Sequence, residues 1–239
     1  MKPIERIFMG YVFEPPGQAT VEVFDSEDRF PVRRIFCVGR NYAAHAREMG
    51  ADPNREPPFF FTKPADAVVD NNVSIPYPPQ TKNLHYEAEL VVAIGKHGCD
   101  ITEADSLSHV WGYAIGNDLT RRDLQQQARE KGRPWDIGKA FDRSAIIGPV
   151  HPISKTGHLI QGKISLSVNG KIKQDADIAD LIWSVSEIIS ILSHSIELHP
   201  GDLIMTGTPA GVGPLVDGDK CTVSIKGLGQ IETKISQKA

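Results

Sequence analysis

Two glutamates separated by one residue, Glu87 and Glu89, stand at the start of an apolar segment that predicts a strand. Side chains alternate between faces along a strand, so the two carboxylates point to one side and Ala88 points to the other. Neighbouring carboxylates repel each other and lose hydration on burial, and a bound cation removes both costs. Asp118 ends a second apolar segment, residues 113–118. The three carboxylates predict a site for one hard divalent cation.

The ligand type limits the metal. Oxygen-only ligation by carboxylates suits Mg²⁺, Mn²⁺ or Ca²⁺, whereas Zn²⁺ usually takes histidine or cysteine. The three cysteines (Cys37, Cys99 and Cys221) lie far apart without C-x-x-C spacing, so they predict neither a disulfide scaffold nor a zinc site. We expect them to pack as small apolar residues.

A short helix over residues 42–49 carries a candidate acid–base pair. Asn41 is placed to cap its start and Gly50 to stop it. His45 and Glu48 stand three residues apart, so their side chains can meet on one face of the helix. An ordinary solvated pair would have the same spacing, and the residues alone do not decide between the two interpretations.

The other predicted elements are short. Thr102 and Thr120 are each followed three residues later by an aspartate, a pattern that resembles a capping box and predicts two helices. Asn169–Gly170 predicts a tight hairpin, and apolar residues repeating every three or four positions predict a helix over 181–192. Many short strands, few helices and no regular strand–helix alternation favour an α+β fold with a mixed sheet.

Composition sets the class of protein. A chain of 239 residues with 40% hydrophobic content can form one large domain. We expect residues 1–30 to form an N-terminal extension of short strands and residues 31–239 a single catalytic domain. The net charge of −4 has no basic excess for nucleic acid or an anionic membrane, and no segment predicts a signal peptide or a membrane span. These features favour a cytoplasmic protein.

Five motifs occur in one order along the chain. They are Arg40-Asn41-Tyr42-Ala43-Ala44-His45, His85-Tyr86-Glu87-Ala88-Glu89-Leu90, Asn117-Asp118-Leu119-Thr120-Arg121-Arg122-Asp123, Lys139-Ala140-Phe141-Asp142 and Thr206-Gly207-Thr208-Pro209-x-Gly211-Val212-Gly213. Together they closely resemble the fumarylacetoacetate hydrolase family, in particular its small acylpyruvase and fumarylpyruvate hydrolase branch. The resemblance runs from about Phe30 to the C-terminus.

The resemblance implies a compact fold around a rolled mixed β-sheet, assembled as a homodimer. It implies Mg²⁺ or Mn²⁺ held by Glu87, Glu89 and Asp118. It also implies four catalytic residues: His45, Glu48, Lys139 and Gln125. In that scheme His45, oriented by Glu48, takes a proton from water, while Lys139 and Gln125 neutralise an oxyanion.

The substrate implied is a β-diketo acid, a 3-acylpyruvate, whose 2-oxo-carboxylate end can chelate the cation. The loop 206–213 offers backbone N–H groups and the Thr208 hydroxyl to a carboxylate. Arg40, Lys63 and Arg121 are equivalent candidates for a remote carboxylate, and Asn41 is a further candidate substrate contact.

The first expectation for function is hydrolysis of fumarylpyruvate to fumarate and pyruvate in aromatic, gentisate-type catabolism. Arg55 to Pro64 particularly resembles the fumarylpyruvate hydrolases. Two alternatives remain: an oxaloacetate decarboxylase or tautomerase, which needs the same metal but no attack by water, and a non-catalytic protein that binds dicarboxylates.

Overall fold

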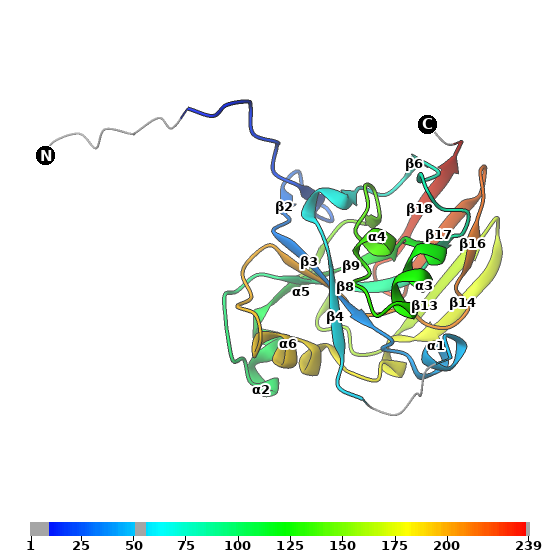
Figure 1. Ribbon diagram of the computed structural model, residues 1–239. Coiled ribbons are helices and arrows are strands. Elements are labelled where there is room, and N and C mark those ends of the chain that lie inside the picture. Colours follow the sequence, from blue (N-terminus) through cyan, green and yellow to red (C-terminus); the bar gives the residue numbers. More distant parts are fainter. Residues whose placement is uncertain (1–9, 51–55, 238–239) are drawn as a thin grey trace, which may run out of the picture.

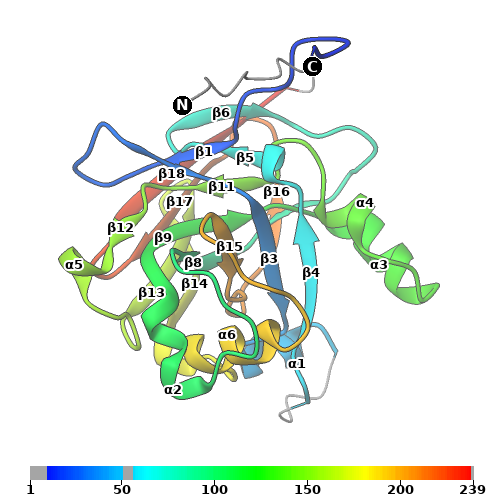
Figure 2. The ribbon, with the colours of Figure 1, turned by 90° about the vertical axis from the view of Figure 1, so that its left-hand side faces the viewer.

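The computed structural model describes residues 10–50 and 56–237. A central mixed sheet has the strand order β4-β3-β15-β8-β9-β11-β5, with β12 also paired to β9 (Figures 1 and 2). Its strands are β3 (Arg34–Gly39), β4 (Phe59–Lys63), β5 (Val68–Val69), β8 (Ala88–Ile94), β9 (Val110–Asp118), β11 (Ala145–Ile147), β12 (His151–Pro152) and β15 (Asp202–Met205). The pairs β15–β3 and β11–β5 are parallel and the others are antiparallel.

A second, outer sheet has the order β14-β13-β17-β18-β6. Its strands are β6 (Val73–Pro76), β13 (Lys163–Val168), β14 (Lys171–Asp177), β17 (Lys220–Ile225) and β18 (Gly229–Ser236). Two small sheets complete the strands, one of β7 (Leu84–Tyr86), β10 (Thr120–Arg121) and β16 (Gly213–Leu215), the other of β1 (Thr20–Glu22) and β2 (Arg29–Pro31).

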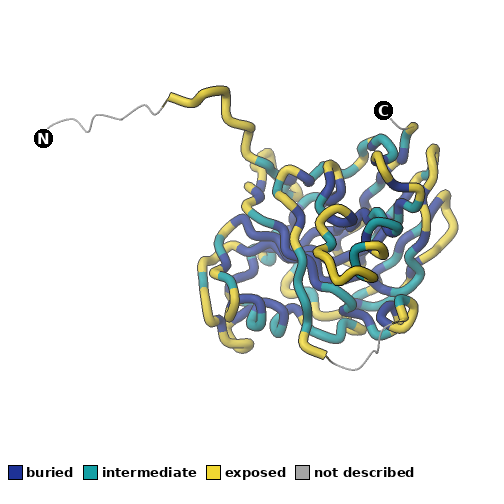
Figure 3. Tube along the Cα trace, viewed as in Figure 1, coloured by how far each residue is buried: buried dark blue, intermediate teal, exposed yellow. Residues whose placement is uncertain are grey.

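The central sheet is buried on both faces. Along β8, Leu90 and Val92 pack into a large core that includes Leu166 and Val223 of the outer sheet, whereas Val91 joins a second core on the opposite face. All seven residues of β8 are buried (Figure 3). A strand covered on both faces reads as a continuous apolar run, so the two charged side chains next to and within it stand out in the sequence.

Short helices surround the sheets. They are α1 (Ala43–Glu48), α2 (Glu103–Ser106), α3 (Arg122–Glu130), α4 (Asp136–Lys139), α5 (Ile153–Thr156) and α6 (Val185–Ser193), with 3₁₀ turns at Ala65–Ala67, Leu107–His109 and Ile178–Asp180. Figure 2 shows α2 and α6 together at one end of the molecule and α3 with α4 on its flank. Within the described ranges, no helix is long and apolar enough to cross a membrane. The predicted α+β class with a mixed sheet and few helices is confirmed.

Several predicted boundaries need correction. The N-cap of α1 is Tyr42, and the Asn41 side chain instead bonds the backbone of Trp183 and Thr206. The helix expected over 181–192 begins only at Val185, where Ser184 and Glu187 form the capping box. Thr120 lies in β10, so it does not cap α3. The hairpin at Asn169–Gly170 is confirmed, with both residues at positive φ.

The N-terminal extension is only partly made of strands. β1 and β2 form a hairpin whose Val21 and Phe30 are buried in the second core. Residues 10–19 form no strand, and the start of this segment runs away from the body of the molecule (Figure 1), whereas Ala19 accepts a hydrogen bond from the Val32 N–H and packs against the second core. The first nine residues of the expected extension lie outside the described part of the chain.

The cysteines are free, as predicted. Cys37 and Cys221 are buried and pack among apolar residues, but Cys99 is exposed, so the prediction of apolar packing is wrong for it.

Candidate active site

The register of two antiparallel strands brings the three carboxylates together. In the β8–β9 pair Ala88 lies opposite Asn117, and the Asp118 N–H donates to the Glu87 carbonyl at 2.9 Å. Asp118 is therefore opposite Glu87, and Glu89 lies two residues along on the same face. One carboxylate oxygen from each residue lies within 4.8 Å of the others. All three side chains are buried, with residue exposures of 4%, 2% and 0% for Glu87, Glu89 and Asp118.

Three buried cations contact two of these carboxylates. The Lys139 ammonium lies 2.7 Å from both Glu87 Oε2 and Asp118 Oδ2, and Lys63 Nζ lies 2.8 Å from Asp118 Oδ1. Arg122 forms a short ion pair with the other oxygen of Glu87. Burial lowers the pKa of Lys139, but Asp118 and Glu87 raise it more, so its pKa lies above the ordinary value and the ammonium stays charged.

Glu89 is different, because none of the ion pairs in the described chain involves it. Its Oε2 accepts one hydrogen bond, from the Gly207 N–H at 2.7 Å. Burial raises the pKa of Glu89, and the charges of Asp118 and Glu87 raise it further, to well above its usual range. The site therefore holds one carboxylate that is buried beside two others without a counter-charge of its own.

The donor set fits a divalent cation. Asp118 Oδ1 is buried and makes no hydrogen bond within the described chain, although Lys63 lies near it. This oxygen and the Glu89 carboxylate have coordination capacity left, and oxygen donors suit Mg²⁺ and Mn²⁺. The convergence of Glu87, Glu89 and Asp118 expected from the sequence is thus present in the fold.

The predicted histidine–glutamate pair is also formed. On α1, His45 Nδ1 lies 3.0 Å from Glu48 Oε2. The Gly211 N–H donates to the same carboxylate at 3.0 and 3.2 Å. Partial burial raises the pKa of Glu48, but the bonds from His45 and Gly211 lower it more, so its pKa lies below the ordinary value. An ionised Glu48 keeps a proton on Nδ1 and leaves Nε2 as the ring nitrogen that can accept one.

A pocket that opens to solvent joins the two groups. It is lined by Glu87 and Glu89, by His45 of α1, and by the following further residues: Val38, Gly39, Arg40, Met49, Phe61, Arg122, Gln125, Gln126, Arg129, Trp135, Lys139 and Thr208. One wall is helix α3, whose pocket residues Arg122, Gln125, Gln126 and Arg129 are spaced as one helical face.

Besides Arg122, two further guanidinium groups stand in the same pocket, those of Arg40 and Arg129. Burial lowers the pKa of Arg40, and the nearby positive charge of Arg129 lowers it further. Arg129 is fixed by a hydrogen bond of 3.0 Å to the Met49 carbonyl, and Arg40 lies 5.5 Å from the centre of the Phe59 ring. Like charges held close together disfavour each other, so this part of the pocket suits an anion.

The remaining predicted residues either line this pocket or lie outside it. Gln125 and Thr208 line the pocket: Gln125 Oε1 accepts from Arg122 at 2.5 Å, and Thr208 Oγ1 accepts from Gln174 at 2.8 Å. Lys139 lines it too, but its ammonium is bound to the carboxylates.

Three predicted substrate contacts do not line this pocket. Asn41 is fully buried, and its side chain makes three hydrogen bonds to backbone groups. Lys63 is buried beneath the site on Asp118. Arg121 lies over the Phe141 ring, 4.3 Å from its centre, and lines a different pocket. Of the three cations considered for a remote carboxylate, only Arg40 lies in this pocket.

The sequence reasoning missed Arg122 and Arg129. Arg122 lies in the motif from Asn117 to Asp123, next to Arg121, which the sequence indicated as a candidate substrate contact. Both arginines belong to a row of polar residues on α3 that are spaced three or four positions apart. This spacing predicts one polar face of a helix and could have identified them.

Residues 34–236 match the family model described as fumarylacetoacetate (FAA) hydrolase C-terminal. The chain belongs to the fumarylacetoacetate hydrolase family. It is 45% identical over 185 residues to a fumarylpyruvate hydrolase of a Ralstonia species, covering 77% of this chain and 95% of that one. It is also 39% identical over 205 residues to the human mitochondrial oxaloacetate tautomerase FAHD1, covering 86% of this chain and 92% of that one.

Solved structures agree. A fumarylpyruvate hydrolase from Pseudomonas aeruginosa, crystallised with Mn²⁺ and pyruvate, has a TM-score of 0.94 and 55% identity, with 96% of this chain and 100% of that chain covered. These relatives place our chain among the fumarylacetoacetate hydrolase family enzymes of hydrolase type. The expected family and its rolled sheet are confirmed, and the expected alternative of a non-catalytic binder is set aside.

Proposed function

We propose that the enzyme hydrolyses the carbon–carbon bond of fumarylpyruvate to give fumarate and pyruvate, in the catabolism of gentisate-type aromatic compounds. The observation that carries this proposal is one pocket that contains the Glu87–Glu89 carboxylates, the His45 ring and the guanidiniums of Arg40 and Arg129. Hydrolysis of fumarylpyruvate needs a cation that the 2-oxo-carboxylate end can chelate and a base that activates water. It also needs a binding site for the second carboxylate, which the fumaryl group carries.

Glu87, Glu89 and Asp118 would hold Mg²⁺ or Mn²⁺. A divalent cation bound there supplies Lewis-acid stabilisation of negative charge on the 2-oxo-carboxylate end of the substrate. Lys139 and Lys63 balance the charge of Glu87 and Asp118 from beneath, so the donor oxygens are positioned before any ligand arrives.

His45 acts as the general base. With Nδ1 held by Glu48, Nε2 takes a proton from a water molecule, and the hydroxide attacks the carbonyl carbon of the fumaryl group. The bond between this carbon and the methylene then breaks. The methylene carbon leaves as the enolate of pyruvate, and a proton returned to it completes the products.

Pocket donors stabilise the oxyanion formed by this attack. Gln125 accepts from Arg122 through Oε1, so its amide N–H groups are free to face the substrate. Lys139, protonated between two carboxylates, adds positive charge close to the reacting atoms. Fixed donors of this kind typically contribute about 10²–10³-fold to kcat.

Arg40 and Arg129 bind the distal carboxylate of the fumaryl group. Guanidinium–carboxylate contacts are charge-assisted and directional, so they favour a dicarboxylate over an acyl group without a charged end. Trp135 and Phe61, which line the same pocket, offer flat apolar surfaces to the unsaturated carbons between the two ends.

A substrate panel tests the proposal. The purified enzyme with Mg²⁺ or Mn²⁺ is given fumarylpyruvate, maleylpyruvate, acetylpyruvate and oxaloacetate, and loss of the enol absorbance is followed. We expect the highest kcat/KM for fumarylpyruvate. Failure to produce fumarate and pyruvate in equal amounts would refute the assignment.

Oxaloacetate tautomerisation or decarboxylation is the second candidate, supported by the 39% identity to human FAHD1. Decarboxylation leaves a pyruvate enolate on the same carboxylate site but needs no attack by water. His45→Ala should therefore lower hydrolysis by about 10²–10⁴-fold and spare decarboxylation. An equal loss of both activities would show that the role of His45 is not restricted to the attack by water.

We also propose that the enzyme works as a cytoplasmic homodimer. The segment that extends from the body of the molecule exposes apolar side chains, with exposures of 70% for Tyr11, 99% for Val12 and 77% for Phe13. Such a segment favours contact with a second subunit. Sedimentation of the full chain against a Tyr11→Ser, Val12→Ser, Phe13→Ser variant measures this contribution directly.

A further inference from the structure

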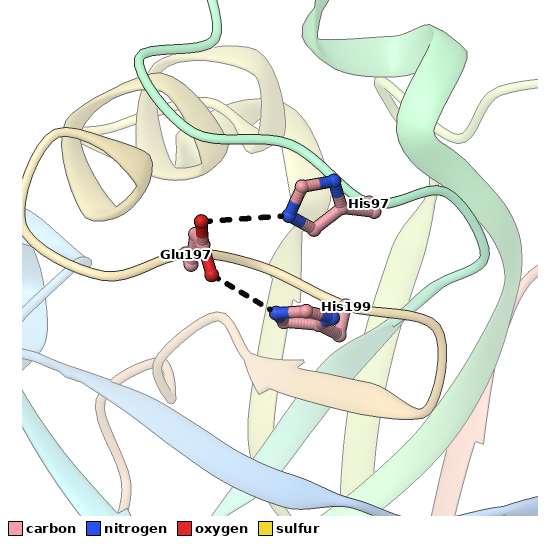
Figure 4. Close-up of side chains that lie close together, drawn as sticks. All are labelled: His97, Glu197 and His199. Atoms are coloured by element: carbon pink, nitrogen blue, oxygen red, sulfur yellow. Dashed lines mark hydrogen bonds and ion pairs between the residues drawn. The ribbon is translucent and has the colours of Figure 1, made fainter.

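Two loops at the end of the central sheet bring together two histidines and a glutamate. His97 follows β8, whereas Glu197 and His199 precede β15 (Figure 4). His97 Nε2 lies 3.7 Å from Glu197 Oε1, and His199 Nε2 lies 3.3 Å from Glu197 Oε2. One ligand atom from each residue lies within 4.8 Å of the other two. Neither the carboxylate site nor the pocket described above involves these side chains.

The backbone holds the three residues in place. Gly98 and Leu198 form an isolated antiparallel bridge, with hydrogen bonds of 3.0 and 2.8 Å, so the two loops are joined between the ligand positions. A Cβ on Gly98 would meet His109 Cε1 at 2.6 Å, which explains the glycine there.

The loop that carries Glu197 and His199 is also bonded to strands of the central sheet. The Glu197 carbonyl accepts from Arg34 at 2.7 Å, and the His199 N–H donates to Asp202 at 2.9 Å. Asp202 is fully buried and is the first residue of β15, so the ligand loop is anchored at the point where the strand begins.

We propose that His97, Glu197 and His199 form a second metal site, which binds Zn²⁺ or another cation that prefers imidazole. Zinc binds histidine nitrogen and carboxylate oxygen at about 2.0–2.2 Å, so two ligands in a tetrahedral arrangement stand roughly 3.3 Å apart. The His97–Oε1 distance of 3.7 Å and the His199–Oε2 distance of 3.3 Å are close to that separation, and each imidazole faces a different oxygen of the Glu197 carboxylate. The side chains are 34–60% exposed, so small rotations can complete the geometry.

This site selects a different metal from the first one. The catalytic carboxylates offer oxygen alone, whereas the loop site offers two imidazoles and a carboxylate, and imidazole favours zinc over Mg²⁺. Glu89 lies near the start of β8 and His97 lies beyond its end, so the five residues from Leu90 to Ile94 separate the two sites by roughly 17 Å or more at 3.3 Å per residue. An ion at the loops links the ends of β8 and β15, which are antiparallel neighbours in the central sheet. It therefore stabilises the folded state, because the unfolded chain lacks the site.

Zinc binding by equilibrium dialysis tests the proposal. The Mn²⁺-loaded enzyme and its His97→Ala/His199→Ala variant share the same catalytic site, so the difference in bound Zn²⁺ reports the loops alone. We expect the variant to bind one Zn²⁺ fewer per chain, and each single variant to bind zinc at least about tenfold more weakly. His194→Ala is the matched control, because His194 is also exposed but bonds only its own helix.

Thermal unfolding provides a second test of zinc binding at the loops. Added Zn²⁺ should raise the Tm of the wild type and of His194→Ala more than that of the double variant, while hydrolase activity stays unchanged in all three. Equal zinc stoichiometry and equal Tm shifts in wild type and double variant would overturn the proposal. Cys99→Ser should bind zinc like the wild type, because the exposed Cys99 thiol is not among the clustered ligand atoms.

Discussion

Replacing Arg129 by methionine tests how the enzyme selects its substrate. Arg129 and Arg40 are the two guanidiniums that we assign to the distal carboxylate, and methionine keeps most of the apolar stem of arginine while removing its charge. The change keeps the metal ligands and His45, but it also removes the hydrogen bond from Arg129 to the Met49 carbonyl at the end of α1. Loss of the charge should affect only substrates that carry the second carboxylate, whereas a shift of α1 would affect every substrate.

The expected size follows from one charge-assisted hydrogen bond. Such a bond contributes about 1.5–3 kcal/mol, and every 1.4 kcal/mol is a factor of ten, so kcat/KM for fumarylpyruvate should fall roughly 10- to 150-fold. The positive charge of Arg129 lowers the pKa of Arg40, so its removal also relieves a repulsion. That relief places the expected loss toward the lower end of the range.

The assay compares two substrates that differ at the distal end. Acetylpyruvate has the same 2-oxo-carboxylate but no second carboxylate, so Arg129→Met should change its kcat/KM by less than about threefold. Lys131→Met is the control, because it removes a positive charge just beyond the end of α3 at a residue outside the pocket. An equal loss for both substrates, or no loss for fumarylpyruvate, would refute the assignment.

Three further predictions concern single residues. His45→Ala should lower hydrolysis by about 10²–10⁴-fold and leave oxaloacetate decarboxylation within a few-fold of wild type, as measured by product analysis of both reactions. Asn41→Ala removes three hydrogen bonds of a buried side chain and should reduce the free energy of unfolding by about 2–4 kcal/mol in urea denaturation; an unchanged midpoint would contradict this. Burial lowers the pKa of His151, so its stabilising effect is present above the unfolded pKa of about 6.5 and is lost as the pH falls through the folded value. His151→Phe, which keeps a ring against Phe24, should make stability less dependent on pH below neutrality.

The carboxylate site could be predicted because it depends on strand alternation and register. Glu87 and Glu89 share a face in any strand, and an antiparallel hairpin-like pair places Asp118 beside them. The His45–Glu48 contact is similarly local, since three residues along a helix decide it. Local periodicity thus determines the parts of the site that the sequence could predict.

Long-range packing determines the rest. Asn41 looks like a helix cap, but its amide satisfies backbone groups some 140 to 165 positions away in sequence, a choice that no local pattern records. Arg121 and Arg122 are adjacent in sequence, yet the start of α3 turns the first toward Phe141 and the second toward Glu87. The side to which a residue at a strand–helix junction points depends on where the helix begins, and Thr120 was expected as the cap of α3 where the structure has Arg121.

Binding of Mn²⁺ to EDTA-stripped protein tests most directly whether three carboxylates hold one cation. We expect one Mn²⁺ per chain in the wild type, with the affinity at least about tenfold weaker in Glu89→Gln and in Asp118→Asn. Glu130→Gln, an exposed carboxylate of α3 outside the cluster, should bind like the wild type. Undiminished Mn²⁺ binding by both Glu89→Gln and Asp118→Asn would contradict the metal site on which the proposed chemistry depends.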